Sequence, residues 1–177
     1  MFNPYLQEFN QIRHSFKDYT HREILVQKYA WAVPNDEAIE AIKALNTAIV
    51  EVGAGSGYWA RVLKEAGIEV KAFDHFKGEF TFTDNWFEVE QGSTEKAVEH
   101  SDKALMLCWP NYNDPFAYNT LKEFKGNTFI YIGESGGGCT GDDQFHHLLN
   151  TKWNHKESVN LPQWFGIHDY LSIWIRR

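Results

Sequence analysis

The chain has 177 residues and a mass of 20.6 kDa, a length that suits one domain with a substantial core. Hydrophobic residues make up 43% and charged residues 23%, which excludes a disordered chain, and two cysteines are too few for a disulfide scaffold. The formal net charge of −7 has the wrong sign for a protein that binds by neutralising phosphates, so it argues against duplex nucleic acid as a partner.

Neither a membrane span nor a secretory signal is visible. No run of apolar residues approaches the length of about 18 that a spanning helix needs. The first residues include Glu8, Arg13, Lys17 and Asp18, where a signal peptide has an apolar stretch. We therefore expect a soluble, cytoplasmic protein without a membrane partner.

The first 45 residues have helical spacing. Apolar residues recur through the segment from Tyr5 to Tyr29, which predicts one amphipathic helix. A second helix is predicted to begin at Asp36, after Pro34 and Asn35. We expect residues 1–45 to cover the edge of a sheet and a pocket as an N-terminal helical extension of a single domain, residues 1–177.

Short apolar runs then alternate with helical patterns, the order typical of an α/β protein. The tail around Tyr170 to Ile175 alternates as a final pair of strands would. The predicted strands are 48–52, 70–73, 87–90, 104–108 and 128–132, and the predicted helices begin near residues 58, 93, 114 and 142.

The strongest motif is a glycine loop between the first strand and the helix that follows it. The run from Glu51 to Gly57 has the spacing G-x-G-x-G, preceded by an acidic residue. Glycines there allow a tight turn and let main chain approach a ligand closely. A dinucleotide-binding loop has the spacing G-x-G-x-x-G instead, so the pattern disfavours a nicotinamide cofactor.

This loop, followed by Asp74 at the end of the second strand, resembles the class I S-adenosylmethionine-dependent methyltransferases. The resemblance implies a Rossmann-like methyltransferase fold, a mostly parallel sheet with helices on both faces, and S-adenosylmethionine as cofactor. It implies that the acidic residue accepts hydrogen bonds from both ribose hydroxyls, a task that suits a carboxylate with two acceptor oxygens.

The same resemblance suggests roles for further residues. The loop would lie under the methionine part of the cofactor, with the acidic residue before it near the ammonium group, and the segment after the third strand would reach the adenine. We expect the cofactor to contact Glu51, Gly53, Ala54, Gly55, Gly57, Asp74, His75, Gln91, Gly92, Cys108 and Trp109.

The fourth strand ends in the run from Cys108 to Tyr112, similar to the N-P-P-Y signature of amino-methylating members of that family. Trp109 stands where that signature has an Asn or Asp, and an indole donates a hydrogen bond but cannot accept one. Methylation of a nucleobase amine is therefore disfavoured. We predict Tyr112 as a catalytic residue that stacks on the substrate, with packing in the core or a loop as the alternative role for both aromatics.

A second glycine cluster, residues 133–141, follows the fifth strand at the same edge of the sheet. We interpret it as a mobile wall of the substrate pocket with Glu134 as its catalytic group; the alternative is a plain connection to a capped helix. Asp142, Asp143, His146 and His147 lack the usual zinc spacings, so we predict no metal.

These patterns predict an S-adenosylmethionine-binding protein that transfers a methyl group to a small or flat acceptor. The aromatic content of 16% is consistent with a pocket for a flat molecule. Two alternatives remain open at this stage, a binding module with this fold but no catalysis and, less favoured, a nicotinamide-dependent oxidoreductase. Neither the acceptor nor the oligomeric state follows from the sequence.

Overall fold

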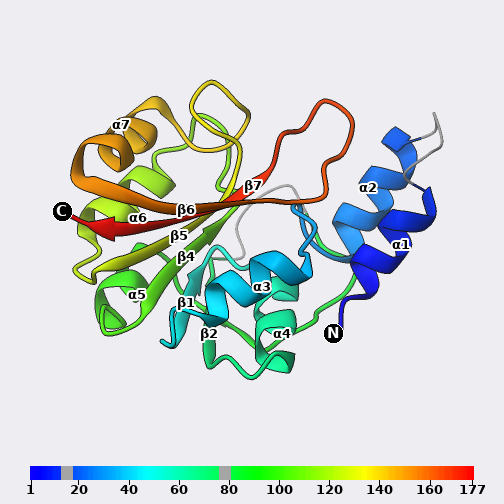
Figure 1. The fold of residues 1–177 in the computed structure, drawn as a ribbon, viewed down its shortest axis with the longest axis horizontal. Helices are drawn as coiled ribbons and strands as arrows, with labels where there is room; N and C mark the ends of the chain where they lie inside the picture. The colour runs from blue at the N-terminus through cyan, green and yellow to red at the C-terminus, as the bar shows by residue number, and fades with distance from the viewer. Residues whose placement is uncertain (13–17, 76–80) are drawn as a thin grey trace.

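A computed structural model describes residues 1–12, 18–75 and 81–177 and contains a sheet of seven strands with helices on both faces (Figure 1). The strand order is β3-β2-β1-β4-β5-β7-β6. The strands are β1 Ile49–Val52, β2 Val70–Asp74, β3 Val89–Gln91, β4 Ala104–Cys108, β5 Thr128–Gly133, β6 Trp153–Asn160 and β7 Tyr170–Arg176. The helices are α1 Pro4–Ile12, α2 Asp18–Lys28, α3 Asp36–Lys43, α4 Tyr58–Glu65, α5 Thr94–Glu99, α6 Phe116–Glu123 and α7 Asp143–Lys152.

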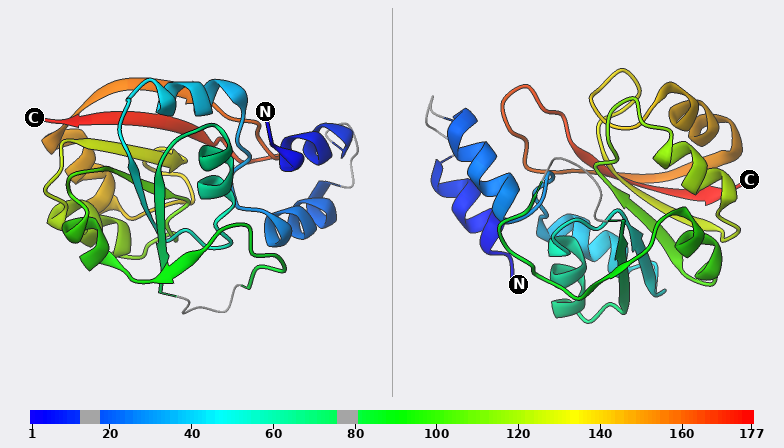
Figure 2. Two further views of the ribbon diagram at one scale, coloured as in Figure 1. Left: turned by 90° about the horizontal axis from the view of Figure 1, so that it is seen from below. Right: turned by 180° about the vertical axis from the view of Figure 1, so that it is seen from behind.

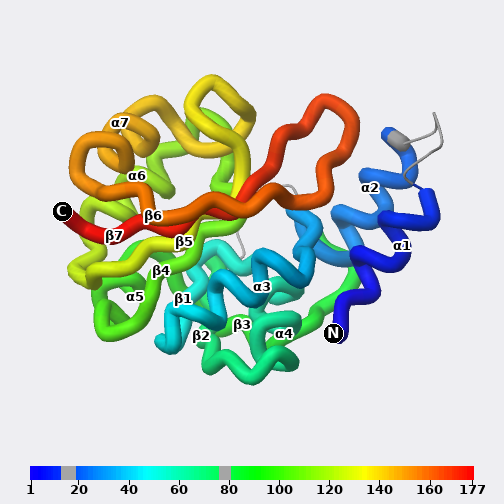
Figure 3. Tube along the Cα trace, viewed as in Figure 1, coloured from blue at the N-terminus to red at the C-terminus, as the bar shows by residue number. Residues whose placement is uncertain are grey.

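The sheet is parallel from β3 to β5 and antiparallel around β7 (Figure 3). The first strand lies between β2 and β4, so the chain changes direction along the sheet after β3. Such a reversal leaves a crevice at the carboxyl ends of the strands, where open α/β sheets bind ligands. The fold therefore places the glycine loop, which follows β1, beside this crevice.

Two hydrophobic clusters fill the space between the sheet and its helices. Alternate residues of each strand point to opposite faces, so Val50 and Leu105 pack under α5, α6 and α7, while Ile49 and Met106 pack under α3 and α4. The α/β fold and the mostly parallel sheet that the sequence predicts are confirmed.

Most predicted elements occur within two residues of their predicted bounds, and β4 coincides with its prediction. Capping residues explain two of the helix starts. Asn35 accepts a hydrogen bond from the backbone of Ala38 at the start of α3, and Asp142 does the same for Phe145 at the start of α7. The final strand predicted around Tyr170 to Ile175 is confirmed as β7, but its partner β6 lies earlier in the chain, at Trp153–Asn160, where no strand was predicted.

The prediction of one helix from Tyr5 to Tyr29 is wrong. The structure has α1 and α2 as separate helices, and residues 13–17 between them lie outside the described part of the chain. The two helices lie side by side beyond the carboxyl ends of the parallel strands (Figure 2). The rings of Tyr5 and Tyr29 stack with centroids 4.8 Å apart. One continuous helix would hold these two rings far apart, whereas two packed helices bring them into contact.

None of the helices in the described ranges is long and apolar enough to cross a membrane.

Candidate functional site

A cavity of about 420 Å³ lies at the carboxyl ends of β1, β2 and β4. Its volume falls within the range of about 300 to 1,000 Å³ typical of small-molecule sites. Its walls come from the glycine loop, from the ends of β2 and β4, and from segments before α3 and before β3. The cavity therefore occupies the place where this class of sheet binds ligands.

The glycine loop adopts a conformation that few other residues tolerate. Gly53, Gly55 and Gly57 have φ angles of 80°, 55° and 74°. The backbone N–H of Gly55 donates a hydrogen bond of 2.8 Å to Oδ2 of Asp74. The turn and the acidic residue at the end of β2 thus form one unit, and both line the cavity.

Glu51 lies beneath this loop with only 1% of its surface exposed. Burial, reinforced by the charge of Asp74 and opposed by a hydrogen bond from the backbone of Ala60, raises the pKa of Glu51 from 4.5 to about 8. Its Oε2 is buried and has no hydrogen-bond partner among the described residues. A buried carboxylate oxygen of this kind indicates a site for a cationic ligand group or an ordered water.

Two phenyl rings cover part of the loop. A Cβ on Gly55 would lie 2.5 Å from a ring carbon of Phe82, and a Cβ on Gly53 would lie 3.4 Å from the ring of Phe116. Both rings line the cavity. The cavity beside the bare main chain is therefore narrowed by the protein's own aromatic side chains but not filled by them.

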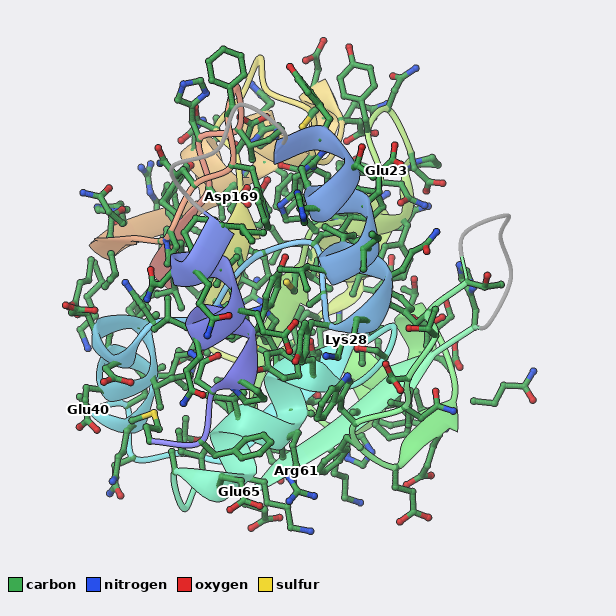
Figure 4. The ribbon with its side chains drawn as sticks, turned by 90° about the vertical axis from the view of Figure 1, so that its right-hand side faces the viewer. Glu23, Lys28, Glu40, Arg61, Glu65 and Asp169 are labelled. Atoms are coloured by element: carbon green, nitrogen blue, oxygen red, sulfur yellow. The ribbon has the colours of Figure 1, made fainter. Side chains whose placement is uncertain are left out.

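The segment that carries Phe82 is fastened to the end of α2 and to the glycine loop. The backbone N–H of Thr83 donates to the carbonyl of Gln27 (2.9 Å), and the indole of Trp86 donates to that of Lys28 (2.6 Å). The backbone N–H of Trp86 donates to the carbonyl of Ser56 (2.8 Å). Figure 4 shows Lys28 at the end of α2, on the side of the molecule where these segments meet.

At the end of β4, Trp109 contributes an aromatic wall. Its ring stacks on that of Trp31, with centroids 4.9 Å apart and an angle of 10° between the planes. Its Nε1 donates a hydrogen bond of 2.8 Å to Oδ1 of Asp169, a residue in the loop that leads into β7. Burial raises the pKa of Asp169 from 3.8 to about 7, against the hydrogen bond from the indole, which lowers it.

The next residues of this strand end are partly engaged elsewhere. The carbonyl of Pro110 accepts a hydrogen bond of 3.0 Å from the backbone of Gly141. Tyr112 is 69% exposed and is not among the residues that line the cavity, so its predicted role stays a prediction. Asn111 and Asp114 line the cavity and supply acceptor oxygens there.

Glu134 organises the second glycine cluster. Its Oε2 accepts a hydrogen bond from the backbone of Cys139 (2.8 Å), and its Oε1 accepts one from the backbone of His168 (2.7 Å). Burial acts to raise the pKa of this carboxyl, but these hydrogen bonds outweigh it and hold the pKa below its usual value. In this structure the carboxylate ties two loops together, and its catalytic role stays a prediction.

The structure brings most of the predicted cofactor residues to one cavity. Of the predicted set, the cavity lining includes Gly53, Gly55, Asp74, His75, Gly92, Cys108 and Trp109, and does not include Glu51, Ala54, Gly57 or Gln91. Lining residues that were not predicted as site residues are Trp31, Val52, Thr81, Phe82, Asn85, Leu107, Pro110, Asn111, Asp114 and Phe116. The aromatic composition of the segments before α3 and before β3 was the one available signal for Trp31 and Phe82.

Asp169 was also missed, and its position in the sequence carries no signal for a site. Within the described ranges, no group of three or more His, Cys, Asp or Glu side chains is arranged to hold a metal ion. The side chain of His146 instead contacts the carbonyl of Thr140, and the side chain of Asp142 caps the start of α7.

No protein-family model matches the chain, and no curated protein matches it in sequence. Among solved structures, it is similar to magnesium protoporphyrin IX methyltransferase from Synechocystis PCC 6803 with bound S-adenosylmethionine, at 11% identity and a TM-score of 0.58 over 97% of this chain and 91% of that one. It is also similar to 1,6-didemethyltoxoflavin-N1-methyltransferase from Burkholderia thailandensis, at 13% identity and a TM-score of 0.50 over 98% of this chain and 85% of that one.

The chain thus has the fold of the class I S-adenosylmethionine-dependent methyltransferases. The resemblance predicted from the glycine loop and Asp74 is confirmed at the level of the fold. The Burkholderia enzyme was crystallised with 1,6-didemethyltoxoflavin and S-adenosylhomocysteine.

Proposed function

We propose that this protein binds S-adenosylmethionine in the cavity beside the glycine loop and transfers its methyl group to a small or flat acceptor. The observation that carries the proposal is the pairing of a bare glycine turn with the buried, unpartnered Oε2 of Glu51 beneath it. A turn with glycine at every other position lets main chain approach the methionine portion of the ligand, and the carboxylate suits its ammonium group.

The residues present fit the rest of the cofactor. Asp74 faces the cavity and has two oxygens with four lone-pair sites, so it can accept from a ribose diol while it holds the N–H of Gly55. His75 and Gly92 line the same part of the cavity, with the backbone N–H of Gly92 bonded to the carbonyl of Asp74 (3.0 Å). These residues would hold the nucleoside.

When bound, the cofactor supplies an electrophilic methyl group on a sulfonium, a good leaving group. The chain's own residues then have to align the acceptor and exclude water, and alignment by itself can lower a barrier by about 7 to 11 kcal/mol. Trp31, Trp109 and Phe116 form an apolar lining that suits both tasks for a flat acceptor. Support for a flat acceptor also comes from the ligand found in the Burkholderia enzyme.

The nicotinamide alternative finds no support in the fold. The dinucleotide-binding order of strands is 3-2-1-4-5-6 in a parallel sheet, whereas this sheet places antiparallel β7 beside β5. The spacing of the glycine loop argues in the same direction.

Calorimetry with S-adenosylmethionine, S-adenosylhomocysteine and NAD tests the proposal. We expect both sulfur ligands to bind and NAD to give no signal. Tight NAD binding with no response to S-adenosylmethionine would overturn the proposal. Formation of S-adenosylhomocysteine with a panel of flat acceptors then tests catalysis, and binding without turnover of any acceptor would point to a binding module.

A further inference from the structure

The indoles of Trp31 and Trp109 stack face to face in the wall of the cavity. They come from segments far apart in the chain, yet their ring planes differ by only 10°. Both residues line the cavity. A stacked pair leaves the outer face of Trp109 uncovered by Trp31, and such a face can receive a planar ring in a stacked geometry.

The backbone at Trp109 is held in an unfavourable conformation. Its φ is 52°, in the left-handed region that bulky residues rarely adopt. Conformations of this kind persist only where the surroundings enforce them, and they cluster at functional sites. Here the backbone N–H of Trp109 donates to the carbonyl of Ile132 at 2.8 Å, and its indole donates to Asp169 at the same distance.

Asp169 is buried in the protein interior. It is 1% exposed, although it belongs to the loop before β7, and it is labelled in Figure 4. Its backbone carbonyl accepts from the side chain of Gln163 at 3.2 Å. The guanidinium of Arg22 lies 5.7 Å from the ring centre of Trp31 and 5.9 Å from that of Trp109, which adds a cation–π contact to the pair.

Two polar groups at this strand end, the indole N–H of Trp109 and the carbonyl of Pro110, are already engaged. The indole N–H of Trp109 is a donor, and it is bound to Asp169. The carbonyl of Pro110 accepts from Gly141. What remains of Trp109 for a ligand is the apolar face of its indole opposite Trp31.

We infer that Asp169 is a positioning residue that fixes Trp109 as one wall of the acceptor site, and that this wall selects a planar ring compound by its face. The inference rests on the proposed function, since it concerns the acceptor side of the same cavity. Asp169 does not line the cavity and acts through the indole.

The test compares 2-naphthol with decahydro-2-naphthol, neutral compounds that share two rings and a hydroxyl but differ in planarity. Binding is measured by ligand-observed NMR titration on the protein saturated with S-adenosylhomocysteine. We expect 2-naphthol to bind at least about fivefold more tightly, the scale of an aromatic contact. Equal affinities, or no binding of 2-naphthol, would overturn the inference.

Variants separate positioning from stability. D169A is expected to weaken 2-naphthol binding at least about fivefold while the affinity for S-adenosylhomocysteine stays unchanged. D169N retains an oxygen that accepts from the indole, so it should restore binding. H168A is the matched control, because the His168 side chain is 79% exposed and its backbone contact to Glu134 remains. Retained 2-naphthol binding in D169A contradicts the inference, as does its loss in a folded D169N.

The outcomes distinguish this inference from the proposed function. Failure of S-adenosylhomocysteine to bind the wild-type chain would remove the proposed function, and the comparison of the two naphthols would then be made on the ligand-free chain. Binding of S-adenosylhomocysteine without preference for the planar compound would leave the proposed function intact and remove the role of the Trp109 wall.

Discussion

Oδ2 of Asp74 accepts a hydrogen bond of 2.8 Å from the backbone N–H of Gly55, so a side chain at the end of β2 holds the turn after β1 in the wall of the cavity. The contact is possible because β1 and β2 are parallel neighbours with Val52 paired to Phe73. The carboxylate that we propose as the ribose ligand therefore also shapes the loop on which the cofactor would rest.

Substitution of Asp74 is expected to weaken the binding of S-adenosylhomocysteine. Asp74→Ala removes the proposed ribose contacts and the acceptor for Gly55, with an expected loss of about 1 to 3 kcal/mol of binding free energy by calorimetry. Asp74→Asn keeps one oxygen for the Gly55 N–H and should lose less. Asp102→Ala is the control, since Asp102 pairs with Lys103 away from the cavity. An unchanged dissociation constant in Asp74→Ala would place the site elsewhere.

A methyl group added to the glycine loop is expected to block the site. In Gly55→Ala the new Cβ would meet the Phe82 ring at 2.5 Å, and the residue would keep a φ of 55°. Gly67→Ala is a matched control, because Gly67 has a φ of 85° but open space around its Cβ position. Both changes should cost about 1 to 2 kcal/mol of stability from the left-handed backbone, and Gly55→Ala should cost more because the Phe82 ring has to shift.

Only Gly55→Ala should lose affinity for S-adenosylhomocysteine, by at least about tenfold, or 1.4 kcal/mol. Thermal unfolding measures the loss of stability in each variant, and calorimetry measures the difference in affinity between them. Equal affinities in the two folded variants would mean that the ligand does not approach the glycine loop.

Binding of the cofactor is expected to release a proton from Glu51. At pH 6.5 the ligand-free carboxyl is mostly protonated, because burial raises its pKa to about 8. An ammonium group placed beside it favours the charged form and lowers that pKa. Calorimetry in phosphate and in imidazole buffer should therefore give different heats in the wild-type protein and equal heats in Glu51→Gln. Buffer-independent heats in the wild type would show that the ammonium lies elsewhere.

The same carboxyl predicts a pH dependence of stability. The pKa of Glu51 is higher in the folded chain than its value of 4.5 in the unfolded chain, so its contribution is complete below pH 4.5 and is lost as the pH rises through 8. Asp169, with a pKa raised to about 7, acts in the same direction.

Denaturant unfolding of the ligand-free protein at pH 5 and pH 8 measures this effect. We expect the free energy of unfolding to decrease from pH 5 to pH 8. The decrease should be smaller in Glu51→Gln than in the wild type, by about 2 to 4 kcal/mol. If the free energy of unfolding changed equally with pH in the wild type and in Glu51→Gln, Glu51 would be hydrated in solution.

Local signals in the sequence determined the fold class and the cofactor end of the cavity. A turn with three φ angles between 55° and 80° strongly favours glycine, and the short apolar runs mark buried parallel strands, so the motif from Glu51 to Gly57 and Asp74 could be identified without coordinates. The edge strand β6 gave a weaker signal, because most of its residues are exposed and polar.

Tertiary structure alone decided the other end of the cavity. Asp169 reaches Trp109, 60 residues away in sequence, and Trp31 stacks on the same ring from the other end of the chain. Neither contact has a local periodicity, because each depends on antiparallel β7 lying beside β5 and on α2 packing beyond the strand ends. Side chains that meet through long-range packing carry no mark of it in the residues next to them, whereas a glycine turn is dictated by the backbone of the residues that form it.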